Sequence, residues 1–190
     1  MRKEMMKIRE ITSIALCLAM LCVSSYVSIP LPFMTTPITA QTIMINTIAL
    51  WLPPAQAMTT IGAYLIVGLI GFPVFAGGSS GISVFLRPTG GFLIAFFISV
   101  GVISGLKKRF PQKFRSNILL TVGIGMPIVY FVGALWMSIL MEIDFAVAFQ
   151  LSVYPFIVGD LLKCLIACSL VERLNGTMKQ RSVFIKRKLA

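Results

Sequence analysis

Two ionisable residues of opposite charge, Asp160 and Lys163, lie in an apolar run from Pro155 to Val171 that contains no other charge. If this run is helical, their i, i+3 spacing places both side chains on one face. Ionisable groups at membrane depth are costly and are usually kept for a function. We interpret the pair as part of a ligand-binding site, in preference to a structural ion pair or a proton relay, because buried ion pairs add little net stability.

Arg87 is the only other charged residue that stands apart from any cluster of charges. It either anchors the chain at the lipid headgroups or faces the mouth of a cavity together with Asp160 and Lys163. In the second case two cations and one anion give a formal excess of +1, which suits a monoanionic ligand. We therefore expect these three side chains to form one binding site.

The composition that surrounds these charges is that of a membrane protein. Hydrophobic residues make up 57% of the chain, charged residues 12%, and the mean hydropathy is +0.93. No Asp, Glu, Lys or Arg occurs between Ile11 and Leu86, which leaves room for several spans of about 20 residues. We expect an uncleaved first span and a multi-pass protein of the cell membrane, since no clean signal-cleavage site follows the first apolar run.

The net charge of +11 comes from basic residues that gather in three short blocks. Such blocks beside hydrophobic segments are typical of cytoplasmic loops, whereas a nucleic-acid-binding protein carries a basic face or a recognition module. The blocks are Arg2 to Arg9, Lys107 to Arg115 and Arg173 to Lys188. Membrane lipid, and not nucleic acid, is the expected surrounding.

Charge asymmetry also decides the number of spans. Residues 41–71 carry Pro53 and Pro54 in the middle and could form one kinked span or a hairpin of two. Only the hairpin places all three basic blocks on the cytoplasmic side, so we expect a single domain of the all-α class with six transmembrane helices and cytoplasmic N and C termini. The expected spans are 11–29, 41–52, 54–71, 88–107, 117–141 and 152–172, followed by a basic tail at 173–190.

The second expected span is short, since residues 41–52 rise only about 18 Å, less than the roughly 30 Å hydrocarbon core. Other helices or packed loops must therefore enclose it. It carries the uncharged hydrogen-bonding residues Gln41, Thr42 and Asn46. These either make contacts between helices or, for Gln41 at the outer end, contact a ligand.

The segment between the third and fourth spans, Phe72 to Arg87, combines glycines with large apolar residues. A solvated loop would not need those apolar side chains. We expect the segment to fold back as a lid over a cavity between the helices, with the glycines allowing tight turns.

Several absences limit the chemistry. The chain has no histidine and no phosphate-binding G-x-x-x-x-G-K-[ST] motif, so we expect no catalytic residue and no ATP hydrolysis by this chain alone. Its four cysteines form no C-x-x-C pair, and no metal site, disulfide or cofactor is expected.

Four segments together resemble the signature regions of the BioY family, the biotin-binding S components of energy-coupling factor (ECF) vitamin transporters. They are PITAQT (37–42), GLIGFPVFAGGSSG (68–81), RPTGGFLIAF (87–96) and PFIVGDLLK (155–163). The resemblance implies a six-helix protein that captures biotin from outside. It also implies a partner, an energy-coupling module of one transmembrane protein and two ATPase subunits.

The resemblance assigns roles to further residues. Ala15 and Ala19 match the Ala-x-x-x-Ala motif through which S components dock on the coupling module, although this spacing alone equally suits internal helix packing. Ser79 lies in a turn where the family tends to carry Gly or Asn, and remains a candidate contact. Phe33, Phe72 or Phe75 could form the apolar walls for the rings and tail of biotin.

The pocket expected from the charges agrees with the chemistry of biotin. Its carboxylate suits Arg87 or Lys163, and its ureido N–H groups could donate to Asp160. A self-sufficient, proton-coupled carrier in which Asp160 changes protonation is the alternative function. An intramembrane hydrolase built on Lys163 is disfavoured, because no serine obviously shares its helix face.

Overall fold

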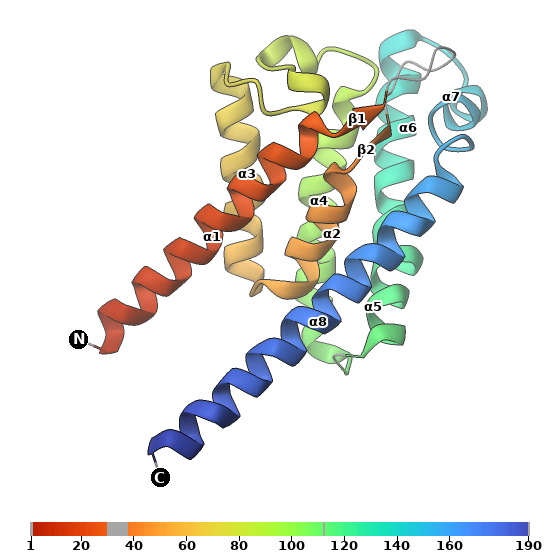
Figure 1. Cartoon of the computed structure of the whole chain (residues 1–190). Helices are drawn as coiled ribbons and strands as arrows, with labels where there is room; N and C mark the ends of the chain where they lie inside the picture. Colours follow the sequence, from red (N-terminus) through yellow and green to blue (C-terminus); the bar gives the residue numbers. More distant parts are fainter. Residues whose placement is uncertain (1, 30–37, 112, 190) are drawn as a thin grey trace.

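Figure 1 shows a computed structural model of the chain, which describes residues 2–29, 38–111 and 113–189. Phe33, one of the candidate wall residues, lies outside the described residues. The described chain is almost entirely helical, in agreement with the expected all-α class. The helices are α1 (Arg2–Tyr26), α2 (Gln41–Trp51), α3 (Pro54–Ile70), α4 (Gly90–Leu106), α5 (Phe114–Leu120), α6 (Met126–Met141), α7 (Phe145–Ser152) and α8 (Ile157–Leu189).

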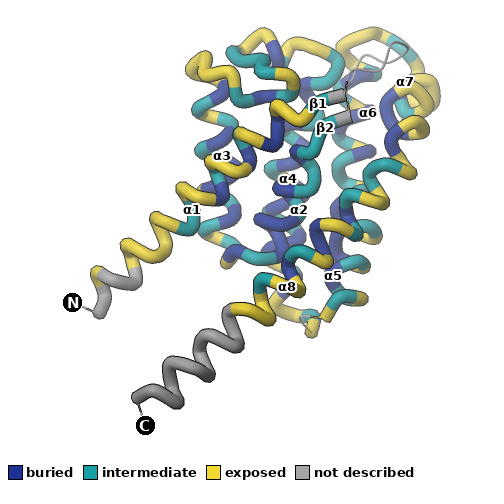
Figure 2. The backbone as a smooth tube through the Cα atoms, viewed as in Figure 1, coloured by how far each residue is buried: buried dark blue, intermediate teal, exposed yellow. Residues whose placement is uncertain are grey.

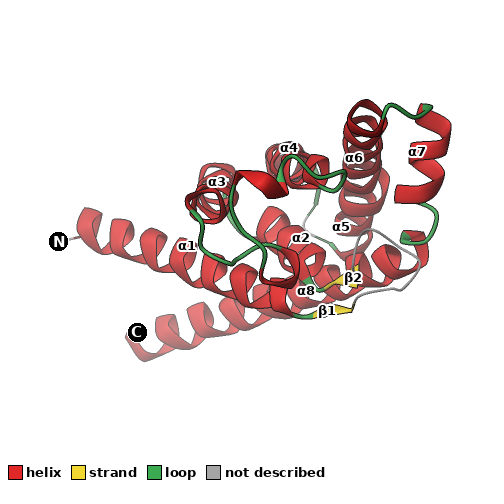
Figure 3. Ribbon diagram, turned by 90° about the horizontal axis from the view of Figure 1, so that it is seen from above, coloured by secondary structure: helices red, strands yellow, loops and turns green. Residues whose placement is uncertain are grey.

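The short helix α2 lies in the middle of the bundle, and α1, α4 and α8 pack around it (Figures 1 and 3). Ile48 and Ala49 of this helix are completely buried. The enclosure keeps the backbone ends of a helix that is too short to span a bilayer away from lipid. α4 packs in turn between α3 and α6.

The outer surface carries large apolar side chains, as expected for a protein in lipid. Phe131 and Leu162 are each 57% exposed, and Ile139 is 67% exposed; Figure 2 shows further exposed residues along α1 and α8. Within the described residues, four helical stretches are long and apolar enough to cross a membrane: Lys7–Tyr26, Gly90–Arg109, Phe114–Met141 and Phe145–Thr177. Pro54–Ile70 is a shorter apolar helix. The chain is thus a multi-pass membrane protein.

The first helix ends earlier than the expected boundary at residue 29. After Tyr26 the chain becomes extended, and strand β1 (Ser28–Ile29) pairs antiparallel with strand β2 (Ile38–Thr39) just before α2. The backbone groups of residues 28 and 29 therefore bond across to another strand and not along the helix.

The last part of the chain differs more from the expected spans. Between the fifth and sixth expected spans, residues 142–151 contain most of helix α7, which packs against α6. The side chain of Asp144 caps α7 by accepting a hydrogen bond from the Ala146 backbone N–H at 2.7 Å. Residues 173–189 of the expected basic tail also belong to a helix, because α8 continues to Leu189. The sequence of α8 contains no proline to stop it.

The fifth span is also longer than expected, because α5 begins at Phe114 and continues through a π-helical turn (Thr121–Gly125) into α6. Pro127 explains the wider turn. It has no N–H to donate to the carbonyl of Gly123, which a regular α-helix would require.

Lys107 does not behave as a member of an exposed basic loop. The residue is only 7% exposed, and its Nζ donates to the carbonyl oxygens of Ala49 (3.0 Å), Leu50 (3.1 Å) and Leu52. In a continuing helix, the N–H groups of residues 53 and 54 would bond to the first two carbonyls. Both of those residues are prolines and have no N–H, so the lysine ammonium supplies the missing donors at the end of α2.

Candidate functional site

A cavity of about 270 Å³ lies at the end of the bundle where α2, α4 and α8 begin. It is lined by residues from β2, α2, the lid segment between α3 and α4, α4, α6, α7 and the first turns of α8. They are Thr39, Gln41, Thr42, Phe75, Ala76, Ser79, Val84, Arg87, Pro88, Thr89, Phe92, Leu93, Phe96, Val129, Tyr130, Ser152, Phe156, Asp160 and Lys163. A cavity of this size, with mostly apolar walls and a few polar groups, is typical of a small-molecule site.

The cavity brings together most of the residues that the sequence singles out. Six of them line it, although they come from distant positions in the chain: Gln41, Phe75, Ser79, Arg87, Asp160 and Lys163. The lid segment also folds back as expected, since Phe75 and Val84 are buried in the cavity wall. Contact of any of the six with a ligand remains a prediction.

Other candidates lie elsewhere. Phe72 is 61% exposed and does not line the cavity. Asn46 lines a smaller void of about 20 Å³ that shares Asp160 with the main cavity. Ala15 and Ala19 are exposed on α1, outside the cavity.

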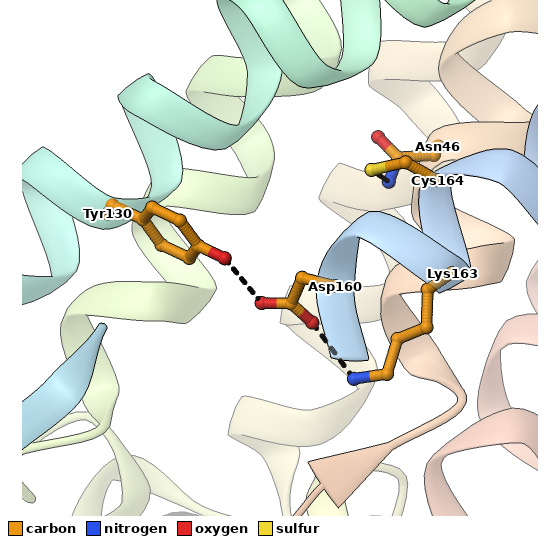
Figure 4. A network of polar contacts seen from close by, with 5 residues as sticks. All are labelled: Asn46, Tyr130, Asp160, Lys163 and Cys164. Carbon is orange, nitrogen blue, oxygen red and sulfur yellow. Dashed lines mark hydrogen bonds and ion pairs between the residues drawn. The ribbon is translucent and has the colours of Figure 1, made fainter. Parts of the chain in front are cut away.

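Asp160 is the centre of a polar network in the cavity wall (Figure 4). Lys163 Nζ lies 2.9 Å from Asp160 Oδ1, and the Tyr130 hydroxyl donates to Asp160 Oδ2 at 3.0 Å. The side chains of Lys163 and Asp160 are only 12% and 14% exposed. Both carboxylate oxygens are thus fixed by protein donors, yet each retains a lone pair for a further donor.

Tyr130 was not identified from the sequence. A signal was available, because a tyrosine in an apolar span needs a partner for its hydroxyl and Asp160 is the only acid in the last apolar run. The distance between α6 and α8 in the sequence hides the pairing.

Arg87 stands at the end of the lid, directly before α4, and its side chain is exposed. Its backbone carbonyl accepts a hydrogen bond from Trp136 Nε1 at 3.2 Å, which ties this point of the lid to α6. Among the described residues, no carboxylate lies within ion-pair distance of its guanidinium. The charge is therefore available to a ligand at the cavity mouth.

The electrostatic balance of the cavity favours an anion. Arg87 and Lys163 outnumber Asp160, and three helices direct their N-terminal ends toward the same region. The residues before α2 and α4, Ala40 and Thr89, make no side-chain cap. The N-terminal end of a helix carries partial positive charge, which favours an anion nearby.

A buried chain of hydrogen bonds begins at Gln41, in another part of the cavity wall. Gln41 Nε2 donates to the Tyr64 hydroxyl, which donates in turn to the Val74 carbonyl at 2.9 Å. Gln41 is 3% exposed and Tyr64 is 1% exposed. The ring of Phe75 packs edge-on against Tyr64, with centroids 5.4 Å apart. Gln41 and Phe75 are candidates that the sequence predicts, whereas Tyr64 is not.

The lid closes tightly over α3. The Gly81 backbone N–H donates to the Gly68 carbonyl at 2.7 Å, and the Tyr26 hydroxyl donates to the Pro73 carbonyl at 2.5 Å. A Cβ on Gly68 would lie 2.0 Å from Phe75 Cζ, so only glycine permits this approach of the lid to α3.

Known proteins resemble this chain over nearly its whole length. It is 32% identical over 177 residues to "Biotin transporter BioY2" of Lactococcus lactis, covering 91% of this chain and 96% of that protein. It is 37% identical over 171 residues to "Probable biotin transporter BioY" of Pyrococcus horikoshii, covering 90% and 99%.

The fold is similar to a solved structure described as the S-component for biotin from an ECF-type ABC transporter. The TM-score is 0.83, the identity is 30%, and the match covers 90% of this chain and 93% of the other. Residues 1–180 also match the profile of the BioY family. The chain therefore belongs to the BioY family, a family of transporter components and not of enzymes.

Proposed function

We propose that this chain captures biotin from outside the cell as the membrane-embedded S component of an ECF transporter. The observation that carries the proposal is the net-cationic cavity at the end of the bundle where α2, α4 and α8 begin, in a chain whose relatives are described as biotin transporters. Biotin carries a monoanionic carboxylate at one end and a neutral ureido ring at the other. The cavity offers cationic, hydrogen-bonding and apolar walls for these parts.

The carboxylate of biotin would bind to the cationic side of the cavity. Arg87 is exposed at the mouth and has no described acidic partner, whereas Lys163 already pairs with Asp160. An unpaired guanidinium can bind a carboxylate with two parallel hydrogen bonds. We therefore assign the carboxylate to Arg87 in preference to Lys163.

The ureido ring would bind deeper, near Asp160. The carboxylate of Asp160 is fixed by Tyr130 and Lys163 and can still accept an N–H from the ring. Phe75 and Phe92 would contact the sulfur-containing ring and the aliphatic tail. Asp160 is thus a fixed acceptor in this scheme, with no need to change its protonation during transport.

The chain would act in the plasma membrane with six spans and with both termini in the cytoplasm. ATP hydrolysis in a separate module of one transmembrane protein and two ATPase subunits would power uptake, and this chain would need no cofactor. Ala15 and Ala19 are exposed on α1, which leaves them open to a partner helix.

Isothermal titration of the purified protein with biotin, thiamine and riboflavin tests the proposal. We expect tight binding of biotin alone. Comparable binding of thiamine, which is cationic, would contradict the assignment of a cationic cavity. Uptake into vesicles driven by a pH gradient, with no ATPase present, would instead support the proton-coupled alternative.

A further inference from the structure

The hydrogen-bond chain behind the cavity has a fixed direction. The Val74 carbonyl can only accept, so the Tyr64 hydroxyl must donate its single hydrogen to it. The same hydroxyl oxygen must then accept from Gln41. Only the NH₂ group of the glutamine amide can donate, so Gln41 Nε2 faces Tyr64.

This direction determines what Gln41 offers to the cavity. With Nε2 bonded to Tyr64, the other end of the amide is the oxygen Oε1. Gln41 lines the cavity, and no described residue donates a hydrogen bond to Oε1. Oε1 is not one of the buried polar atoms that lack a partner, so a ligand N–H that enters the cavity can donate a hydrogen bond to it.

Tyr64 does not itself line the cavity. It is buried behind the wall, where Phe75 packs against its ring. Its hydroxyl bonds both to Gln41, the first residue of α2, and to Val74 of the lid. Tyr64 therefore acts on a ligand only through Gln41 and the lid.

We propose that Tyr64 is a positioning residue that turns the amide oxygen of Gln41 toward the cavity, where it accepts a hydrogen bond from a neutral N–H group of the ligand. The inference rests on the proposed function for the identity of that ligand, since the ureido ring of biotin supplies two such N–H groups. Gln41 and Asp160 then provide two acceptors for the two donors. The pair would distinguish biotin from a ligand of similar shape that lacks one N–H.

The test compares the dissociation constants of biotin and of its two mono-N-methyl derivatives, one at each ureido nitrogen. For each derivative, the ratio of its dissociation constant to that of biotin measures discrimination. Tyr64→Phe removes only the hydroxyl and frees the Gln41 amide to rotate. We expect the ratio for one derivative to fall about fivefold, the effect of one neutral hydrogen bond.

Tyr26→Phe is the matched control. It removes the other tyrosine hydroxyl that holds the lid, on the Pro73 carbonyl, without touching Gln41. Its discrimination ratio should stay within about twofold of the unaltered protein, as expected for the loss of a lid contact that orients no ligand group. In a Gln41→Ala background, Tyr64→Phe should cause no further loss of discrimination, because the amide that it orients is gone.

Gln41→Ala alone removes the acceptor that Tyr64 orients. It should also lower the ratio, and it provides the test if Tyr64→Phe does not fold. A Tyr64→Phe protein that weakens biotin and both derivatives equally, or that changes none of them, overturns the inference. Failure of the unaltered protein to bind biotin overturns the proposed function and this inference together.

Discussion

The substitution Asp160→Asn tests the central polar network. The carboxylate accepts hydrogen bonds from Lys163 at 2.9 Å and from Tyr130 at 3.0 Å, with little exposure of either charged side chain. Asparagine keeps the size but removes the charge, so Lys163 loses its counter-charge and an NH₂ group faces the ligand donors. A hydrogen bond to a charged group contributes about 1.5–3 kcal/mol. We expect the dissociation constant for biotin to rise at least about tenfold.

Isothermal titration of the purified variant measures this effect, with a thermal melt to verify folding. Asp144→Asn is the matched control, because Asp144 is an exposed acid that caps α7 away from the cavity. Asparagine is an equally good cap, so its dissociation constant should change by less than about twofold. If a folded Asp160→Asn protein also binds biotin within this range, and Lys163→Ala does the same, the pair serves only to hold α8 in place.

Three further substitutions test other parts of the structure. Gly68→Ala should lower the unfolding free energy by about 1–3 kcal/mol in a thermal melt and weaken biotin binding, because its Cβ would meet the Phe75 ring. Gly62→Ala, in the same helix α3, should do neither, because the nearest atom to its Cβ is Phe97 Cε2 at 3.6 Å, an ordinary contact distance. Lys107→Met should lower the unfolding free energy by about 2–3 kcal/mol, since it leaves carbonyls of α2 without donors. Lys108→Met, at an exposed site, should have little effect. Equal melting temperatures of the two variants would refute the capping role of Lys107. Ala15→Trp should preserve biotin binding and impair uptake in cells that contain the coupling module, and a loss of binding as well would place this exposed position in the fold or the pocket and not in docking.

The charges that are isolated in the sequence lie together in the wall of one cavity. Asp160, Lys163 and Arg87 stand out because each is costly or unusual where it lies, and the cavity unites them. Gln41 could be predicted from its place at the end of the short second span. Phe75 could be predicted from the apolar residues of the lid segment and from the family resemblance. Tyr64 and Tyr130 were not, because a single tyrosine in an apolar helix does not indicate which distant residue its hydroxyl contacts.

The sequence did not predict the boundaries of several elements, or the presence of α7. Hydropathy identified the long apolar helices but not α7, whose only local signal was the Asp144 cap. The positive charge of residues 173–189 does not reveal their helical conformation, although the stretch contains no proline that would end a helix. Charge reports on the side of the membrane, whereas helix propensity decides the backbone.

The contact of Lys107 with the end of α2 has a consequence for how this sequence can change. The lysine supplies donors that Pro53 and Pro54 cannot. Lys107 and this proline pair therefore depend on one another, although more than fifty residues separate them. A relative that replaces these prolines with residues that have an N–H would no longer need a buried ammonium there. An alignment of related sequences should therefore show the proline pair and the lysine gained and lost together, whereas the neighbouring exposed Lys108 should vary independently of them.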